Sequence, residues 1–558
     1  MTTSELRPKS DSQSAPPLNL ALVTHNFPVS APQNSLQFAH VVVSSLGDAP
    51  WRSQSEAGNP IVLLMKIGET VVGAAPFPTL TVASQQRLRF SFQWQATGPL
   101  GGTELVLEWA EQNVAILGPL GRWAIDLTAP LTARGPALMS AAQAHNSWFY
   151  LPSQGVYWSR HSRHHYPLFV QTAKGSRFWD ADGEEFIDYV SGWGACLLGY
   201  GEPRVRRRVQ RSLASGSLTT LPNVLEMELT AQLCDWFPSA EMATYGKNGS
   251  DVCTAAVRLA RAYTQRPKVF YCGYHGWQDW NAESFGHTRT AIPPHASPVV
   301  APFPSQDAEA AMALFHQHPG QIAALVIEPA AQIEGLNGPI RPANGAFLAT
   351  LLELCRANGA LLIFDEIFTG FRYLKGSVQQ ATGVQPDLTC LGKSLSAGMP
   401  LSALIGRRDV FQEAMSRIAY DSTFKGEPHS FAAALTALEI YRQEPVVEQV
   451  WQFGQQLMQG INQLCQEMEI PAKVVGLPIR MTLAIDDIPD ADLIRTFVQQ
   501  QLLLQGILCF RGFMIPSYAH SLADLKATLR AYQASFGALK DARERDTILA
   551  QLEIPIVC

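Results

Sequence analysis

The sequence predicts a multi-domain protein: an N-terminal all-β sandwich, an α/β domain with a mainly parallel sheet, and a small C-terminal α+β subdomain. Three observations support this fold class. The length of 558 residues exceeds that of an ordinary single domain. Residues 18–133 alternate apolar and polar side chains, as half-buried strands do. From about residue 147, helical patterns alternate with short apolar strands, which is typical of a parallel sheet covered by helices.

Composition excludes two classes of protein. The chain carries 42 basic and 48 acidic residues, a net charge of −6, and 47% of its residues are hydrophobic. Long disordered chains combine low hydrophobicity with high charge, so disorder over most of the length is excluded. No basic excess is present to neutralise phosphates, and we therefore expect no nucleic-acid partner.

Targeting and cysteine signals indicate a cytoplasmic protein. Residues 1–17 are polar, lack the order of a signal peptide, and are expected to form a disordered tail. No apolar run of about 20 residues predicts a membrane span. The nine cysteines are scattered without a C-x-x-C pair, which gives neither a disulfide framework nor a zinc site. We expect reduced thiols and no bound metal.

The predicted sandwich occupies residues 18–133, and a linker is expected at residues 134–146. Clusters rich in Gly, Asn and Pro separate its strand-like stretches, as turns do. The strand candidates are residues 38–43, 88–94, 105–109 and 123–127. The arrangement resembles the immunoglobulin-like sandwiches that are appended to bacterial polysaccharide-biosynthesis enzymes, although no motif in it is specific.

The most informative stretch of the α/β region combines an acidic strand end with a downstream lysine. An apolar run ends in Asp365-Glu366, and Gly392-Lys393-Ser394 follows it. A strand that ends in carboxylates places them at the carboxyl edge of the sheet, where open α/β sheets bind ligands. An ATPase phosphate loop needs a glycine at the position of Asp387, and the loop should precede the acidic strand. The sequence therefore disfavours an ATPase.

A lysine and a carboxylate in this order suit an aldehyde cofactor. Such a cofactor needs one lysine amine to hold it as a Schiff base and one carboxylate to keep its pyridine nitrogen protonated. Lys393 is the candidate for the first role and Asp365 for the second. Either residue alone carries little weight, because an isolated lysine is usually a surface charge.

Seven stretches in order make this interpretation specific. They are residues 179–190 with Trp193-Gly194, Gly-Lys-Asn-Gly-Ser-Asp at 246–251, Tyr-His-Gly-Trp at 274–277, Ile-Glu-Pro at 327–329, Phe-Asp-Glu-Ile at 364–367, Leu-Gly-Lys at 391–393 and Ser-Thr-Phe-Lys-Gly-Glu-Pro at 422–428. With these stretches, residues 145 to about 540 resemble the class III (fold type I) pyridoxal-phosphate-dependent aminotransferases, in their glutamate-1-semialdehyde aminomutase-like branch. The resemblance implies pyridoxal 5'-phosphate as the cofactor. It also implies a large cofactor-binding domain with an N-terminal segment at 147–427, a small α+β subdomain at 428–540 and a C-terminal tail at 541–558.

The sequence around residue 250 supports a phosphate site. Apolar residues recur at helical spacing after Asp251, so a helix is predicted to begin there, directly after Asn248-Gly249-Ser250. A helix N-terminus offers free amide donors and a partial positive charge. The resemblance assigns Asn248, Gly249 and Ser250 to the cofactor phosphate. Simple capping of the helix by Ser250 is the alternative.

The resemblance assigns four further residues. Tyr274 and His275 would place an aromatic ring on the pyridine face of the cofactor. Thr423 corresponds to a threonine that reaches the cofactor phosphate of the neighbouring subunit, which implies a homodimer with shared active sites. Trp193 matches a tryptophan near the substrate.

The implied reaction is transfer of an amino group from an amino donor to a keto or aldehyde acceptor, in polysaccharide- or amino-sugar-related metabolism. Aminomutases of the branch resemble one another in a Pro-Ser-x-Phe-Glu-Ala segment, but residues 506–520 lack its glutamate. The segment near residue 155 also lacks their Asn-Ser-Pro-Val-Arg. Both departures favour an aminotransferase, and intramolecular amino transfer by an aminomutase is the alternative. A further alternative is a non-catalytic carbohydrate-binding or scaffold protein with an idle transferase fold.

Overall fold

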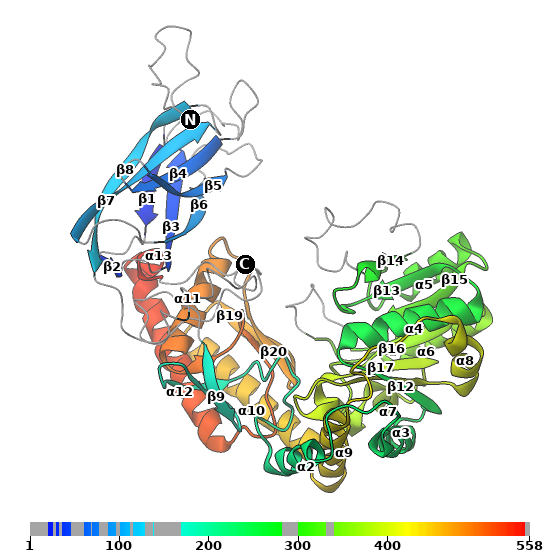
Figure 1. Cartoon of the computed structure of the whole chain (residues 1–558). Helices are drawn as coiled ribbons and strands as arrows, with labels where there is room; N and C mark the ends of the chain where they lie inside the picture. The colour runs from blue at the N-terminus through cyan, green and yellow to red at the C-terminus, as the bar shows by residue number, and fades with distance from the viewer. Residues whose placement is uncertain are drawn as a thin grey trace.

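The computed structural model describes residues 169–281, 300–330 and 340–552, together with the backbone of eight strands between residues 20 and 128 (Figure 1). The expected N-terminal tail and the expected linker lie outside the described residues. Among the described residues, no helix is long and apolar enough to cross a membrane.

The N-terminal strands form two sheets. In the first, β1 (Leu20–His25), β3 (Leu36–Ser45) and β6 (Arg87–Gln95) pair antiparallel in the order β1-β3-β6. The second has the order β2-β8-β7-β4-β5 and is antiparallel apart from the β2-β8 pair. Its strands are β2 (Ser30–Pro32), β4 (Ile61–Ile67), β5 (Thr70–Pro76), β7 (Gly101–Glu111) and β8 (Ala115–Thr128). The four strand candidates lie in β3, β6, β7 and β8, while the packing of the two sheets as a sandwich stays a prediction.

A seven-stranded mixed sheet forms the centre of the large domain. Its order is β12-β18-β17-β16-β15-β13-β14, and within this sheet only β18 runs antiparallel to its neighbours. The strands are β12 (Met242–Gly246), β13 (Lys268–Cys272), β14 (Val300–Pro302), β15 (Ile322–Ile327), β16 (Leu361–Asp365), β17 (Leu388–Leu391) and β18 (Ser402–Gly406). Every residue of β15 and β16 is buried, as expected for strands covered on both faces.

Helices cover both faces of this sheet (Figure 1). On one face, α4 (Gly249–Thr264) shares a buried core with Leu361 and Ile363 of β16. On the other face, α6 (Gly345–Ala357) shares a core with Leu362 and Phe364. Because side chains alternate along a strand, both faces of β16 are fixed, and Asp365 is held at its carboxyl end. The other helices of this region are α2 (Pro203–Leu213), α3 (Val224–Trp236), α5 (Ala308–Gln317), α7 (Val378–Thr382), α8 (Arg408–Ala414) and α9 (Pro428–Gln443).

The C-terminal region packs three long helices against small sheets (Figure 1). The helices are α10 (Val446–Glu467), α11 (Ala491–Leu504) and α12 (Leu522–Glu544). One sheet, β19-β20-β22, consists of β19 (Ala472–Leu477), β20 (Arg480–Ile485) and β22 (Phe513–Met514). The other joins β9 (Val170–Lys174), β10 (Arg177–Asp180) and β11 (Glu185–Asp188) to the distant β21 (Ile507–Leu508). Part of the expected C-terminal tail is helical, since α13 (Ile548–Gln551) buries Ile548 and Leu549 in the core of this region.

Candidate active site

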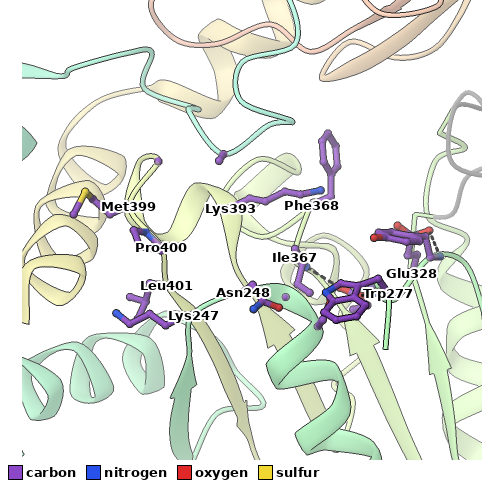
Figure 2. Close-up of a pocket in the computed structure, with 17 residues that line it drawn as sticks. Lys247, Asn248, Trp277, Glu328, Ile367, Phe368, Lys393, Met399, Pro400 and Leu401 are labelled. Atoms are coloured by element: carbon purple, nitrogen blue, oxygen red, sulfur yellow. Dashed lines mark hydrogen bonds between the residues drawn. The ribbon is translucent and has the colours of Figure 1, made fainter. Parts of the chain in front are cut away.

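A pocket of about 400 Å³ lies where β15, β16 and β17 end and α4 begins (Figure 2). Six of the residues that the sequence predicts for the site line it together: Asn248, Gly249, Ser250, Tyr274, Asp365 and Lys393. His275 lies behind Asp365, and neither Trp193 nor Thr423 is among the lining residues. The structure therefore gathers most of the predicted site and separates three of its members from the pocket wall.

The N-terminus of α4 forms one end of the pocket. Asn248, not Ser250, caps the helix: its side chain accepts from the amide of Asp251, 3.2 Å away, and the Asp251 carboxylate accepts from the amide of Asn248 in return. Gly249 has no room for a side chain, because a Cβ there would lie 2.5 Å from Cδ1 of Ile367. The amides of the first helical turn and the helix dipole make this end of the pocket suitable for an anion such as a phosphate.

A buried acid-base pair forms the floor of the pocket. Asp365 Oδ2 lies 2.8 Å from Nδ1 of His275, and the other ring nitrogen of His275 lies 3.1 Å from the carbonyl oxygen of Cys272. Both ring nitrogens of His275 therefore lie within hydrogen-bond distance of an oxygen atom. The second carboxylate oxygen of Asp365 accepts from the amide of Ile367 at 3.1 Å. The carboxylate of Asp365 is therefore held by the imidazole ring of His275 and by the amide of Ile367.

The adjacent residues Tyr274 and His275 lie in different environments. Tyr274 lines the pocket, where burial raises the pKa of its hydroxyl to about 12 and keeps it protonated. Its backbone amide donates to Oε2 of Glu328 at 3.1 Å. His275 is buried beneath the pocket against Asp365. Of the two, only Tyr274 is therefore placed on the pocket wall.

Lys393 follows β17 and extends its side chain toward the ring of Phe368 (Figure 2). Its Nζ lies 5.1 Å from the ring centroid. Burial, and then the nearby charges of Arg480 and Arg372, lower the pKa of Lys393 to about 8. A substantial fraction of its amine is therefore neutral near physiological pH, which is the form that attacks a carbonyl.

Two buried arginines surround the same phenyl ring and were missed by the sequence reasoning. The guanidinium carbon of Arg372 lies 4.4 Å from the Phe368 centroid, and that of Arg480 lies 5.3 Å from it. Arg480 also stacks on Phe513, 4.7 Å away. Burial lowers the pKa of both guanidinium groups to about 10. The Gly-Phe-Arg run after the acidic strand was the only signal for Arg372, and nothing near β20 marked Arg480.

Thr423 is exposed, and it lies four residues before Glu427, which contacts a residue of the pocket wall. Lys247, which lines the pocket, forms an ion pair with Glu427 at 2.9 Å. Glu427 also caps α9 by accepting from the amide of Ser430 at 3.2 Å. The pocket and the Thr423 segment are therefore connected through a partly buried ion pair.

Trp193 lies two residues before Ala195, which lines the pocket. Its side chain is 37% exposed, and its ring contacts Phe510 edge to face with centroids 5.0 Å apart. Trp193 is thus placed beside the pocket and is not part of its wall.

Comparison with known proteins identifies the family. A family model for aminotransferase class-III matches residues 158–511. The chain belongs to the class III aminotransferases. Glutamate-1-semialdehyde 2,1-aminomutase of Sulfurihydrogenibium azorense is 31% identical over 398 residues, covering 67% of this chain and 92% of the relative. The enzyme of the same name from Syntrophobacter fumaroxidans is 31% identical over 401 residues, covering 67% of this chain and 91% of the relative.

Two solved structures have a similar fold. The FumI protein of a Sphingopyxis species, solved in a form with pyridoxal phosphate, aligns with a TM-score of 0.67 and 28% identity over 74% of this chain and 97% of that one. An omega-transaminase from Sphaerobacter thermophilus aligns with a TM-score of 0.66 and 26% identity over 74% of this chain and 98% of that one. The resemblance stated from the sequence is confirmed, including the fold type I architecture of the matched region.

The pocket fits the cofactor of the family, pyridoxal phosphate. It combines a lysine whose pKa is lowered to about 8, a buried carboxylate, and the N-terminus of α4, where Gly249 and Ser250 line the pocket. These are the groups that an aldehyde, a pyridine nitrogen and a phosphate require. This class III aminotransferase is an enzyme of pyridoxal-phosphate-dependent amino-group transfer. The family and the pocket do not favour the non-catalytic alternative.

Proposed function

We propose that Lys393 holds the cofactor through its amine, that Asp365 binds the pyridine nitrogen, and that residues 248–250 bind the phosphate. The support is geometric, because all of these residues line one pocket at the carboxyl edge of the sheet. Tyr274 would cover one face of the cofactor ring. Ile367, whose side chain lies next to Gly249, would cover the other face. When bound, pyridoxal phosphate supplies an electron sink for negative charge at the reacting carbon of the substrate.

Lys393 also moves the proton in this proposal. With a substrate amine bound in its place, Lys393 would take a proton at Nζ from the substrate carbon and would later give one back. A pKa of about 8 suits this task, since a general base works best when its pKa lies near the working pH. Replacing Lys393 by alanine should remove both the anchor and the proton carrier, and lower the rate by at least about 100-fold.

In this proposal His275 orients the carboxylate of Asp365 toward the pyridine nitrogen. The carboxylate of Asp365 is buried at the end of β16. The imidazole 2.8 Å away and the amide of Ile367 fix the orientation of this carboxylate. We infer that His275 acts through Asp365 and does not stack on the cofactor ring.

We infer that the substrates are a small-molecule amino donor and a keto or aldehyde acceptor, in polysaccharide- or amino-sugar-related metabolism. The exposed Trp277 lines the pocket mouth, and Trp193 lies beside it, so two indoles are available to a ring-containing substrate. Where the aminomutases have their glutamate segment, this chain has Phe510, which packs on Trp193, and Arg511. Transfer between two molecules is therefore favoured over intramolecular transfer.

We infer a homodimer in which Thr423 reaches the cofactor phosphate of the partner. Thr423 is exposed next to Phe424, which is 59% exposed. Large apolar side chains are also exposed on and between α2 and α3; they are Leu213, Leu218, Leu221, Val224 and Met227. Apolar groups gathered on one surface usually mark an interface. We further infer a cytoplasmic location and an immunoglobulin-like sandwich for residues 18–133, with the domain boundaries predicted from the sequence.

A half-reaction screen tests the proposed chemistry. Amino acids and amino sugars labelled with ¹⁵N are offered singly to the enzyme loaded with cofactor, and loss of the visible cofactor band is followed. A transaminase passes the label to an added acceptor on a second molecule. Return of the label to the original carbon skeleton without an acceptor would instead show an aminomutase. Failure of every amine to discharge the band would contradict the proposed function.

Sedimentation of residues 135–558 tests the proposed homodimer. We expect a dimer that retains the half-reaction. A fully active monomer would remove the basis for placing Thr423 in the partner's site.

A further inference from the structure

Four consecutive residues beside the pocket have left-handed backbone conformations. The φ angles of Ser191, Gly192, Trp193 and Gly194 are 50°, 59°, 57° and 81°. The left-handed conformation costs about 1–2 kcal/mol for a residue with a side chain, so Ser191 and Trp193 are strained. Such a turn persists only where its surroundings hold it. We call residues 191–194 the left-handed turn.

Local hydrogen bonds hold the first half of the left-handed turn. The amide of Ser191 donates to Oδ1 of Asp188 at 3.1 Å, and its hydroxyl donates to the carbonyl oxygen of Ile515 at 2.9 Å. The amide of Cys196 donates to the carbonyl oxygen of Ser191 at 3.0 Å. These contacts anchor Ser191, but none of them reaches the carbonyl group of Gly194 at the end of the turn.

Arg372 holds that end. Its Nη2 donates to the carbonyl oxygen of Gly194, and its Nη1 donates to the carbonyl oxygen of Phe368 at 2.9 Å. Arg372 is only 1% exposed. Among the described residues it forms no ion pair with a carboxylate. A buried cation without a carboxylate is costly, so two backbone carbonyl groups are its main polar compensation. The cost suggests a role beyond packing.

The left-handed turn, Arg372 and the pocket wall are in direct contact. A Cβ at Gly194 would lie 2.9 Å from the Phe368 ring and 3.2 Å from Nη1 of Arg372. Phe368 lines the pocket beside Nζ of Lys393 (Figure 2), and Ala195, the residue after the turn, lines it as well. Any movement of the Arg372 guanidinium group therefore displaces two parts of the wall next to the reactive lysine.

We propose that Arg372 is a positioning residue: its guanidinium group links the left-handed turn to Phe368 through two hydrogen bonds, and we call this link the clip. The clip fixes the part of the pocket wall beside Lys393, and the substrate lies on that part of the wall. Arg372 does not touch substrate or cofactor in this proposal; it acts through Gly194 and Phe368. The proposal rests on the proposed function only in assigning this wall to the substrate.

Hydrogen–deuterium exchange of the protein without cofactor tests the clip directly. The amides of Gly194, Ala195 and Cys196 all donate within or around the left-handed turn. In Arg372→Met their exchange should accelerate about tenfold or more, because a hydrogen bond from a charged group is lost. Arg372→Lys keeps one donor and should restore part of the protection. Arg266→Lys is the matched control, since Arg266 also donates to two backbone carbonyl groups, those of Ile322 and Asn358, far from the turn.

Kinetics of the loaded enzyme supply the second readout. Arg372→Lys should raise KM for the amino donor about tenfold while the affinity for pyridoxal phosphate changes less than about threefold, because the phosphate and pyridine groups bind elsewhere. Gly194→Ala perturbs the same contact from the side of the turn. The double variant should therefore be no worse than the more severe single variant, as for residues that act as one unit.

The outcomes separate this proposal from the proposed function. Unchanged exchange at residues 194–196 in a folded Arg372→Met or Arg372→Lys variant would overturn the clip, whichever amine the enzyme uses. Fully additive effects of Gly194→Ala and Arg372→Lys would also overturn it. If no amine discharges the cofactor, the exchange result still stands and only the proposed function fails. Should Arg372→Met not fold, the Arg372→Lys and Gly194→Ala pair decides the question.

Discussion

Replacing Lys393 by methionine should stabilise the protein without its cofactor at neutral pH. In the folded chain the pKa of Lys393 falls from its ordinary 10.5 to about 8, chiefly through burial and secondly through Arg480 and Arg372. Below pH 8 the amine is charged in both the folded and the unfolded chain, so folding carries the full cost of burying that charge. Methionine keeps the length of the side chain and removes the cost.

The magnitude follows from the size of the fall in pKa. A change from 10.5 to about 8 corresponds to about 3 kcal/mol at 1.36 kcal/mol per pKa unit. Access of solvent to the pocket side of Lys393 reduces this, as does the lost contact with Phe368, which is worth about 0.5–1 kcal/mol. We expect a net stabilisation of about 1–2 kcal/mol at pH 7.

The sign of the pH dependence is fixed by the same values. Between pH 8 and 10.5 the unfolded chain keeps the proton that the folded chain has lost, so the stability of the native sequence rises with pH in this window. The advantage of Lys393→Met should therefore fade across the window and vanish above it. Urea denaturation of the cofactor-free protein at pH 7 and at pH 10.5 measures the difference.

The exposed Lys473 on β19 provides the control. Lys473→Met should leave the stability unchanged at both pH values. If Lys393→Met destabilises the protein at pH 7, or stabilises it equally at both pH values, the argument that burial depresses the pKa of this amine is wrong.

Three further predictions concern other parts of the chain. Gly249→Ala should weaken cofactor binding by about tenfold, because the added Cβ would clash with Cδ1 of Ile367. Adding Ile367→Val removes that Cδ1 atom and should restore the cofactor titration to that of the native protein. Arg480→Met removes a charge that lowers the pKa of Lys393. Because this amine acts as a general base, the acidic limb that it sets in the pH profile of the half-reaction should move to higher pH, and an unmoved profile would argue against the electrostatic role of Arg480. Deleting residues 1–133 should leave cofactor binding and the half-reaction within about threefold, and a folded dimer that no longer binds the cofactor would contradict the predicted division of domains.

Local sequence patterns predict the strand ends and the helix start that build the site, because each of them is determined by residues that are close together in the sequence. The apolar run before Asp365 is β16, buried at every residue, and the helix expected near Asp251 begins at Gly249. Lys393 follows β17 directly, so its place at the carboxyl edge of the sheet follows from strand order and direction. A strand end and a helix start each require only a few consecutive residues.

The charges around Lys393 depend on tertiary contacts that no local pattern encodes. Arg480 comes from β20 in the C-terminal region, yet its guanidinium group stacks on Phe368 of the large domain. The left-handed conformation of Trp193 depends on contacts of its turn with Ile515 and Arg372. The separation of Tyr274 and His275 likewise depends on Asp365, which comes from another strand. These features require the packed chain.

The lysine that bears the covalently bound cofactor decides whether Lys393 is its anchor. The enzyme is loaded with pyridoxal phosphate, reduced with borohydride and digested, and the pyridoxyl-bearing peptide is identified by mass spectrometry. We predict a single adduct, on Lys393, which lies beside Asp365 in the pocket. An adduct on Lys247, the other lysine that lines the pocket, or on Lys375 or Lys425 would contradict the account.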